Sequence, residues 1–175
     1  MAPPVHITFL GGLGEIGRNC AVLELEGRMV VLDCGQMFVD DHYPGVNSVL
    51  PDFTYLLDNA DRVEGIIATH CHEDHIGGLP HLLPDLQVPV YGSAFTLGMV
   101  RGKLEQEDLD FKPELIELHD GERRKIGAFD CEFLPVTHST PSGLITAFHT
   151  PQGIILHSSD FKLDLTPVDG RRTNL

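Results

Sequence analysis

The chain has 175 residues, 42% of them hydrophobic, which suffices for one domain with a sizeable core. Its 26 acidic and 12 basic side chains give a formal net charge of −14 at pH 7, so its surface repels nucleic acid and anionic membranes unless cations offset the charge. No apolar run could span a bilayer, and the N-terminus lacks the features of a signal peptide, so we expect a cytoplasmic protein with no membrane partner.

The first third of the chain predicts strands around a glycine-rich loop. Residues 5–10 predict a strand that leads into the glycine-rich segment 11–19. This segment contains a formal G-x-G-x-x-G pattern, but β-leaning residues 20–26 follow it where a dinucleotide-binding helix would begin. We therefore expect a loop between strands, followed by a further strand at 29–32.

Asp33 directly follows that strand, so its carboxylate is expected at a strand end. It is either a solvated turn residue or, if its strand neighbours the next one, a support for a metal-binding histidine. Residues 36–51 are polar and predict a surface loop, and residues 53–57 predict a short helix.

A dense cluster of metal-ligand side chains follows the apolar run 65–68. Residues 69–75 read Thr-His-Cys-His-Glu-Asp-His. In extended backbone His70 and His72 point to the same side, towards one metal ion, whereas Asp74 and His75 lie beyond a turn and can face a second ion. Imidazole with carboxylate suits zinc, and manganese where oxygen ligands predominate. A solvated histidine-rich loop is the alternative, but three histidines in this pattern favour a two-metal hydrolytic site.

The cysteines do not extend this site. The chain has four, widely spaced and without a Cys-x-x-Cys pair, so the sequence indicates neither a zinc ribbon nor a dithiol redox site. Cys71 lies between two of the histidines, and strand alternation is expected to point its sulfur away from the metals.

The second half of the chain predicts an α/β domain. Residues 88–92 predict a strand and residues 94–104 a helix, and three further strands are expected at 115–118, 122–126 and 129–135. The one basic triplet, 123–125, is expected on a solvated edge strand rather than at an RNA contact.

His138 and Asp160 each follow an apolar run, as Asp33 and His70 do. Because strand ends gather along one edge of a sheet that has crossover helices, we expect these four side chains to meet at one edge. Packing or surface roles are expected for the six remaining histidines, which are His6, His42, His81, His119, His149 and His157.

The pattern His70-x-His72-x-Asp74-His75, with the histidine and aspartates that follow other strands, resembles the metallo-β-lactamase superfamily. More closely, the chain resembles the ribonuclease J family over essentially its whole length. The segments that match that family's signatures in order are 11–19, 37–38, 51–53, 72–77, 97 with 101–104, 136–139 and 160–170.

The resemblance implies an αββα sandwich, of which residues 1–175 would be the N-terminal half, without the β-CASP insert that grips RNA. It implies two divalent metal ions and a hydroxide, held by them, that attacks RNA phosphodiesters. The implied activities are 5′-exonuclease and endonuclease cleavage in RNA maturation and decay. The resemblance also implies that the full-length protein is a homo-oligomer.

The resemblance also implies roles for single residues. His70, His72 and His138 would hold one ion and Asp74 with His75 the other. Asp160 would bridge the two ions. Two carboxylates are assigned to catalysis, Asp74 and Asp33. Of these, Asp33 would support the site without being a metal ligand.

Two departures from the family pattern leave the ligands named above in place, whereas the family's second half of the sandwich would supply a further histidine. Thr140 and Ser142 replace an apolar and an acidic residue that commonly follow His138, and Ser158-Ser159 replaces Thr-Gly before Asp160. Two alternatives to a nuclease stay open: a thioester or lactam hydrolase of the same superfamily, and a non-catalytic metal-binding module.

Overall fold

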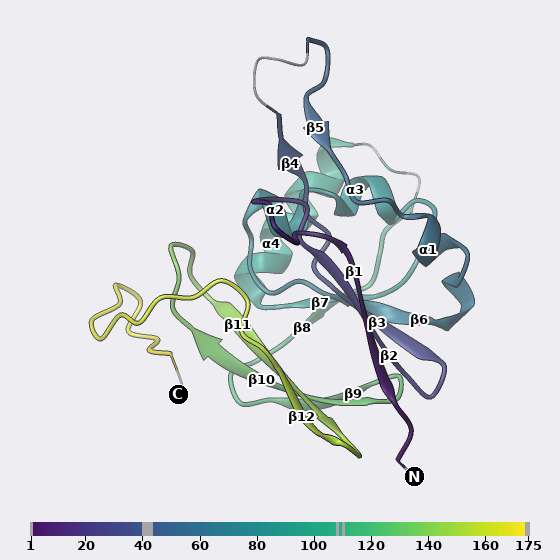
Figure 1. Ribbon diagram of the computed structural model, residues 1–175. Helices are drawn as coiled ribbons and strands as arrows, with labels where there is room; N and C mark the ends of the chain where they lie inside the picture. Colours follow the sequence, from purple (N-terminus) through teal and green to yellow (C-terminus); the bar gives the residue numbers. More distant parts are fainter. Residues whose placement is uncertain (1, 40–43, 108, 110, 174–175) are drawn as a thin grey trace.

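A computed structural model describes residues 2–39, 44–107, 109 and 111–173. Helices, a six-stranded sheet and a four-stranded sheet are stacked in that order (Figure 1). This is the α/β layering expected from the sequence, and the described residues form three layers of the αββα sandwich.

The six-stranded sheet has the order β1-β2-β3-β6-β7-β8. Its strands are β1 (Val5–Gly11), β2 (Cys20–Leu25), β3 (Arg28–Leu32), β6 (Val63–Ile67), β7 (Val90–Gly92) and β8 (Leu115–Glu117). Strands β1 to β3 are antiparallel, whereas β3, β6, β7 and β8 run parallel. The apolar runs of β3 and β6 are buried on both faces, which explains why they read as continuous apolar sequence.

The four-stranded sheet is antiparallel and has the order β12-β11-β10-β9. Its strands are β9 (Arg123–Ile126), β10 (Phe129–Val136), β11 (Gly143–Thr150) and β12 (Gly153–His157). The run around His149 reads as strand-like, but the bounds of β11 were not predicted, because six of its eight residues are buried and the strand lacks the alternation of apolar and polar residues that marks β10.

The helices cover the outer face of the larger sheet (Figure 1). They are α1 (Thr54–Leu57), α2 (Glu73–Ile76), α3 (Leu79–Leu82) and α4 (Ala94–Gln106), with a 3₁₀ turn at Ala60–Arg62. Ser93 caps α4, because its Oγ accepts a hydrogen bond from the backbone N–H of Thr96 at 3.3 Å. No described helix is long and apolar enough to cross a membrane.

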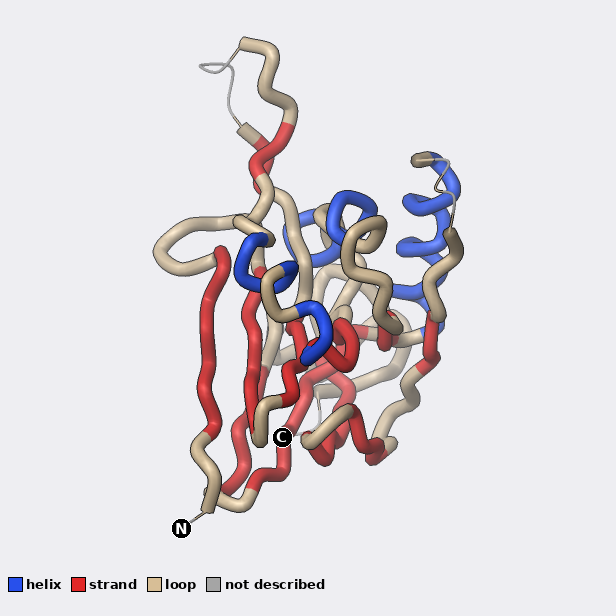
Figure 2. Tube along the Cα trace, turned by 90° about the vertical axis from the view of Figure 1, so that its right-hand side faces the viewer, coloured by secondary structure: helices blue, strands red, loops and turns tan. Residues whose placement is uncertain are grey.

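The predicted surface loop 36–51 contains a small two-stranded ribbon. Strands β4 (Met37–Phe38) and β5 (Ser48–Val49) pair antiparallel, and the ribbon projects from the body of the molecule (Figure 2). Residues 40–43 of the loop, His42 among them, lie outside the described residues.

Two apolar cores hold the three layers together. The first lies between the helices and the larger sheet, where Val31 and Ile66 pack with Leu82. The second lies between the two sheets, where Val30 packs with aromatic side chains of the smaller sheet, namely Phe129, Phe133 and Phe148. Because successive residues of β3 contribute to different cores, this strand fixes the spacing of all three layers.

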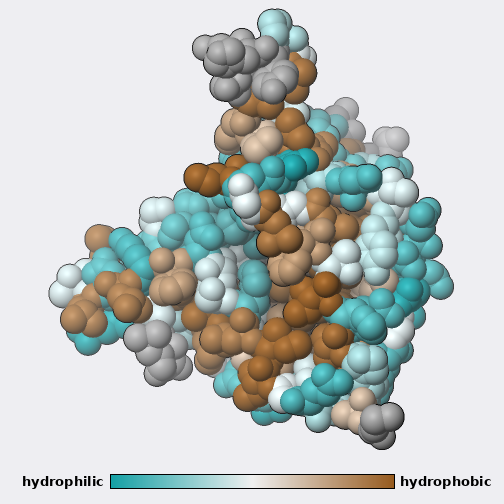
Figure 3. Space-filling view, in the orientation of Figure 1, coloured by the Kyte–Doolittle hydropathy of each residue, from teal (hydrophilic) through white to brown (hydrophobic). Residues whose placement is uncertain are grey.

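The edge strands β1 and β12 lie on the same side of the molecule and carry exposed apolar side chains. Gln152 Nε2 donates to Pro3 O at 3.0 Å beside these strands. Figure 3 shows the apolar surface over them, which includes Ile7, Phe9, Ile154 and Leu156. An exposed apolar strand edge favours association with another segment or chain.

Candidate metal centre

The fold brings four strand ends together. Asp33 follows β3, and His70 comes three residues after the end of β6, which lies beside β3 in the same sheet. His138 follows β10, and Asp160 comes three residues after the end of β12 in the facing sheet. As expected, these four side chains lie together at one edge, although they come from two sheets rather than one.

Two groups of side chains could each hold a metal ion. In the first, ligand atoms of His70, His72 and His138 all lie within 4.8 Å of one another, and in the second those of His70, His75 and Asp160 do so. His70 belongs to both groups. Its Nε2 lies 3.1 Å from Nδ1 of His72, so the two imidazoles converge as the sequence predicted.

Asp160 lies between the two groups. One of its oxygens is 3.7 Å from Nε2 of His75, and the other is 3.7 Å from Nε2 of His138. Asp74 Oδ2 lies 3.6 Å from the same His75 nitrogen, although Asp74 is in neither group of three. The carboxylates therefore lie around His75, whereas the possible ligands near His72 are mainly imidazoles.

Asp33 is buried behind His75 and does not join either group. Its Oδ1 accepts a hydrogen bond from the backbone N–H of Thr69 at 2.8 Å, and its Oδ2 accepts one from the Thr69 hydroxyl at 2.9 Å. Oδ2 also lies 2.7 Å from Nδ1 of His75. Burial alone would raise the pKa of this carboxyl, but the His75 imidazole and the Thr69 hydrogen bond outweigh it and lower the pKa. The same partnership raises the pKa of His75 against the effect of its burial.

Hydroxyl groups hold the other nitrogen of His70. Its Nδ1 lies 3.0 Å from Thr69 Oγ1 and 3.3 Å from Ser159 Oγ. Burial and the neighbouring histidines lower the pKa of His70 to about 3. The imidazole is therefore neutral at physiological pH, and the Nε2 that faces His72 is free of a proton if Nδ1 carries it.

Close backbone contact fixes the turn that carries Asp74 and His75. Asn19 N donates to Asp74 O at 3.0 Å, and Cys34 N donates to His75 O at 2.8 Å. A Cβ added at Gly35 would lie 1.6 Å from Asp74 O, so only glycine permits this approach. The segment after β3 thus clamps the histidine-bearing segment after β6.

Sequence reasoning missed three polar residues that support the ligands. Asn19 Nδ2 donates to Asp74 Oδ2 at 3.2 Å and lies 3.1 Å from Nε2 of His75. The other two, Thr69 and Ser159, contact Nδ1 of His70. A signal was present, because each lies within one residue of a predicted ligand or at the end of the glycine-rich loop. Only the fold shows which atoms they reach.

Cys71, His149 and His157 lie outside the two metal groups. Cys71 Sγ lies 3.0 Å from Thr140 Oγ1 and is in neither metal group, as strand alternation predicted. His149 pairs with Glu132 at 2.8 Å, away from the metal groups. His157, expected in a packing or surface role, is half-buried at the end of β12, and its buried Nδ1 has no hydrogen-bond partner among the described residues.

The donor set fits divalent transition metals. Neutral imidazoles with carboxylates are the usual ligands of zinc, and the nitrogen that does not face the metal is normally held by a carboxylate or another polar group. His75 has Asp33 in that position and His70 has Thr69 with Ser159. The arrangement can hold two cations next to each other and so bind and polarise an anionic substrate.

Comparison with known proteins decides the family. The profile of the Beta-lactamase superfamily domain matches residues 28–163, which contain every residue of the two metal groups. The chain belongs to this superfamily. Membership implies divalent metal ions at this edge, and it confirms the fold class expected from the sequence.

Within the superfamily, the chain is similar to ribonuclease J proteins. It is 43% identical to ribonuclease J of Mycolicibacterium smegmatis over all of this chain and 32% of that protein. It is 44% identical to ribonuclease J of Mycobacterium tuberculosis over 98% of this chain and 30% of that protein. The chain therefore spans about a third of the length of these relatives, which fits an N-terminal portion. The resemblance drawn from the sequence is confirmed.

A solved structure supports the same fold. A protein of unknown function from Enterococcus faecalis V583 superposes with a TM-score of 0.68 at 21% identity, covering 93% of this chain and 44% of that protein. At this identity the similarity concerns the fold alone.

Proposed function

We propose that the chain is the metal-binding part of a ribonuclease J-type enzyme that hydrolyses RNA phosphodiester bonds with two divalent ions. The observation that carries the proposal is the convergence of the two ligand groups at one edge of the stacked sheets. The ribonuclease J relatives support RNA as the substrate class and support 5′-exonuclease and endonuclease cleavage as the reaction to test. When bound, the ions supply a water of lowered pKa and neutralise charge on the phosphate oxygens.

In this proposal each ligand has one role. His70, His72 and His138 would hold one ion, Asp74 and His75 would hold the other, and Asp160 would be shared between them. Zinc suits the imidazole-rich position, and manganese is the second candidate where carboxylates predominate.

Asp33 acts in the proposal as a positioning residue. Its 2.7 Å contact with Nδ1 of His75 keeps a proton on that nitrogen and thereby keeps the lone pair of Nε2 directed at Asp74 and Asp160. The Thr69 hydroxyl supports His70 in the same manner, at 3.0 Å from Nδ1. These contacts orient the ligands before any substrate arrives.

A lactam or thioester hydrolase of the same superfamily is the competing enzyme class, and a non-catalytic metal-binding module is the competing non-enzyme class. No residue-level observation favours either over the nuclease. Similarity to ribonuclease J across 98 to 100% of the chain weighs against both.

The test joins this chain to the parts that its relatives carry in addition. In ribonuclease J of Mycolicibacterium smegmatis, the matching segment is replaced by this chain, with and without His70→Ala. We expect the hybrid to bind metal and to cleave 5′-monophosphorylated RNA, and the variant to lose both, because His70 lies in both ligand groups. The 175-residue chain alone is expected to bind metal but to cleave weakly, because its charge of −14 repels RNA.

Three measurements make the outcome decisive. Metal analysis that finds equal metal in the chain and its His70→Ala variant overturns the ligand assignment. Hydrolysis of a chromogenic lactam without cleavage of RNA favours the competing enzyme class. Metal binding by a folded hybrid that hydrolyses neither substrate favours the non-catalytic module.

A further inference from the structure

Two cavities reach the candidate metal centre. One, of about 190 Å³, is lined by residues that include Asp33, His75 and Asp160. The other, of about 360 Å³, lies on the far side of His138 and is bounded by residues 136–141 and by the segment 162–169. Among the described lining residues, the second cavity has one lysine, Lys162, together with two carboxylates, Asp164 and Asp169, whereas the first has neither lysine nor arginine.

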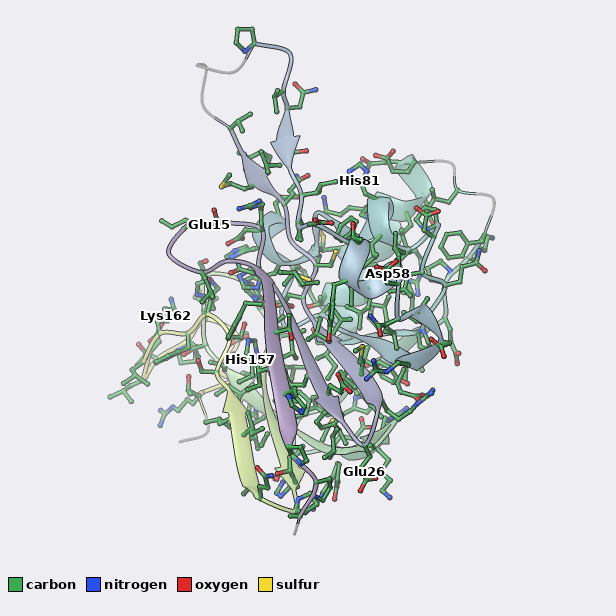
Figure 4. The ribbon with its side chains drawn as sticks, turned by 45° about the vertical axis from the view of Figure 1, so that its right-hand side comes forward. Glu15, Glu26, Asp58, His81, His157 and Lys162 are labelled. Atoms are coloured by element: carbon green, nitrogen blue, oxygen red, sulfur yellow. The ribbon has the colours of Figure 1, made fainter. Side chains whose placement is uncertain are left out.

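The backbone of Lys162 is fixed next to the metal ligands. Its N–H donates to Thr137 O at 2.8 Å, and its carbonyl accepts a hydrogen bond from the Thr137 hydroxyl. Thr137 directly precedes His138, and Lys162 comes two residues after Asp160. Figure 4 shows Lys162 in the segment that follows β12. The backbone that carries this cation is therefore fixed beside His138 by two contacts with Thr137.

The charge of Lys162 is available to a ligand. Among the described residues its carboxylate partner is Asp164, at 3.4 Å, and Asp164 also accepts a hydrogen bond from the backbone N–H of Thr166 at 2.9 Å. The lysine side chain is 53% exposed. By contrast, Lys103 pairs with Glu73 in a closer contact. The long, exposed contact to Asp164 leaves ammonium donors free for an anion.

The walls of the cavity suit the rest of a nucleotide. Pro141, Pro167 and Val168 supply apolar surface, and Val168 is fully exposed. Ser139 lines the same cavity, and its Oγ lies 3.3 Å from Nε2 of His72. Apolar surface with a few convergent polar groups and a volume of this size is typical of a small-ligand site.

We propose that this cavity holds the nucleotide next to the scissile bond of a single-stranded RNA, with Lys162 binding that nucleotide's phosphate. The inference rests on the proposed function, since His138 joins the cavity to the metal centre. Lys162 is then a positioning residue: it binds the RNA backbone whatever the base, while the apolar walls contact the ribose or base.

The test measures binding rather than cleavage. The zinc-loaded, isotope-labelled chain is titrated by nuclear magnetic resonance with a diribonucleotide whose phosphorothioate linkage resists hydrolysis. Three variants are compared with wild type: Lys162→Ala, Lys162→Arg and Lys125→Ala. Lys125 is the matched control because it is an exposed lysine on β9, outside the cavity lining.

Amide signals of residues 136–141 are expected to shift in the wild type. Lys162→Ala should raise Kd about two- to fivefold, the range for one exposed ion contact, and should reduce the slope of log K against log salt by about 0.7. Lys162→Arg should restore most of the affinity, and Lys125→Ala should leave the slope unchanged. All four proteins should contain the same amount of zinc.

Two results would overturn the inference. The first is an equal effect of Lys162→Ala and Lys125→Ala, and the second is absence of binding by the zinc-loaded wild type. Neither result decides the proposed function, which depends on RNA cleavage by the hybrid enzyme and on metal content. Failure of that hybrid would remove the basis of the inference separately.

Discussion

Replacing Asp33 by asparagine is expected to weaken one metal position and spare the other. Asp33 has φ +58°, a conformation that asparagine tolerates as well as aspartate does, so the backbone can stay in place. If the asparagine oxygen keeps the Thr69 N–H, its NH₂ group faces Nδ1 of His75 and the Thr69 hydroxyl. Nδ1 must then become an acceptor, and the proton moves to Nε2, the nitrogen that faces Asp160.

The magnitude follows from the contacts that are lost. Loss of such a supporting carboxylate typically lowers metal affinity about 10- to 100-fold. Asp33 is 2% exposed, and replacing its charged hydrogen bonds is expected to cost about 2 kcal/mol of unfolding free energy in the metal-free chain. His70, His72 and His138 do not contact Asp33 directly. The Thr69 hydroxyl is their link to it, so the position that they build should keep most of its affinity.

The assay is a zinc titration of the metal-free chain against a chromophoric chelator, combined with urea unfolding. The control is Asp58→Asn, which removes the same charge from an exposed residue at the end of α1 (Figure 4). We expect two affinities in wild type and control, with only one of them reduced in Asp33→Asn. Two unchanged affinities would refute the reasoning and leave Asp33 as a turn residue. An equal fall of both affinities would refute the selectivity.

Two further predictions concern stability. Between pH 6.5 and pH 3 the unfolded chain protonates His70 while the folded chain, where its pKa is about 3, does not. The unfolding free energy of the metal-free chain should therefore fall as the pH drops through this window, by at most about 1.4 kcal/mol per pH unit from this residue. Urea unfolding at several pH values checks this, and a His70→Ala variant with an equally steep dependence would contradict it. Gly35→Ala should destabilise the chain by about 2 kcal/mol or more, because its Cβ would lie 1.6 Å from Asp74 O. The control is Gly98→Ala in α4, where nothing lies within 4 Å of the added Cβ. This variant should instead stabilise the chain by about 0.5 to 1 kcal/mol in thermal unfolding. A similar response of both variants would show that the close contact at Gly35 is unimportant.

The sequence by itself determined the class of the protein and the residue types gathered at its candidate metal centre. The density of histidines from His70 to His75 is a local pattern, and its meaning does not depend on distant contacts. The apolar runs before Asp33, His138 and Asp160 are local too, and each marks the end of a strand. Most strands of the larger sheet, and helices α1 and α4, followed from the same patterns.

Only the tertiary structure decided how these ends meet. The parallel pairing of β3 with β6 brings Asp33 within 2.7 Å of Nδ1 of His75, a contact across 42 residues. Stacking of the second sheet adds His138 and Asp160. Strand pairing and core packing are non-local, so no window of sequence contains them.

The same reason explains what sequence reasoning missed. The bounds of strand β11 could not be read, because the strand is largely buried and shows no clear period of its own. Asn19 and Ser159 have ordinary neighbours in sequence, and they reach His75 and His70 only through the fold. The ligand types could be read from the residues, whereas the groups that orient them depend on which strands lie side by side.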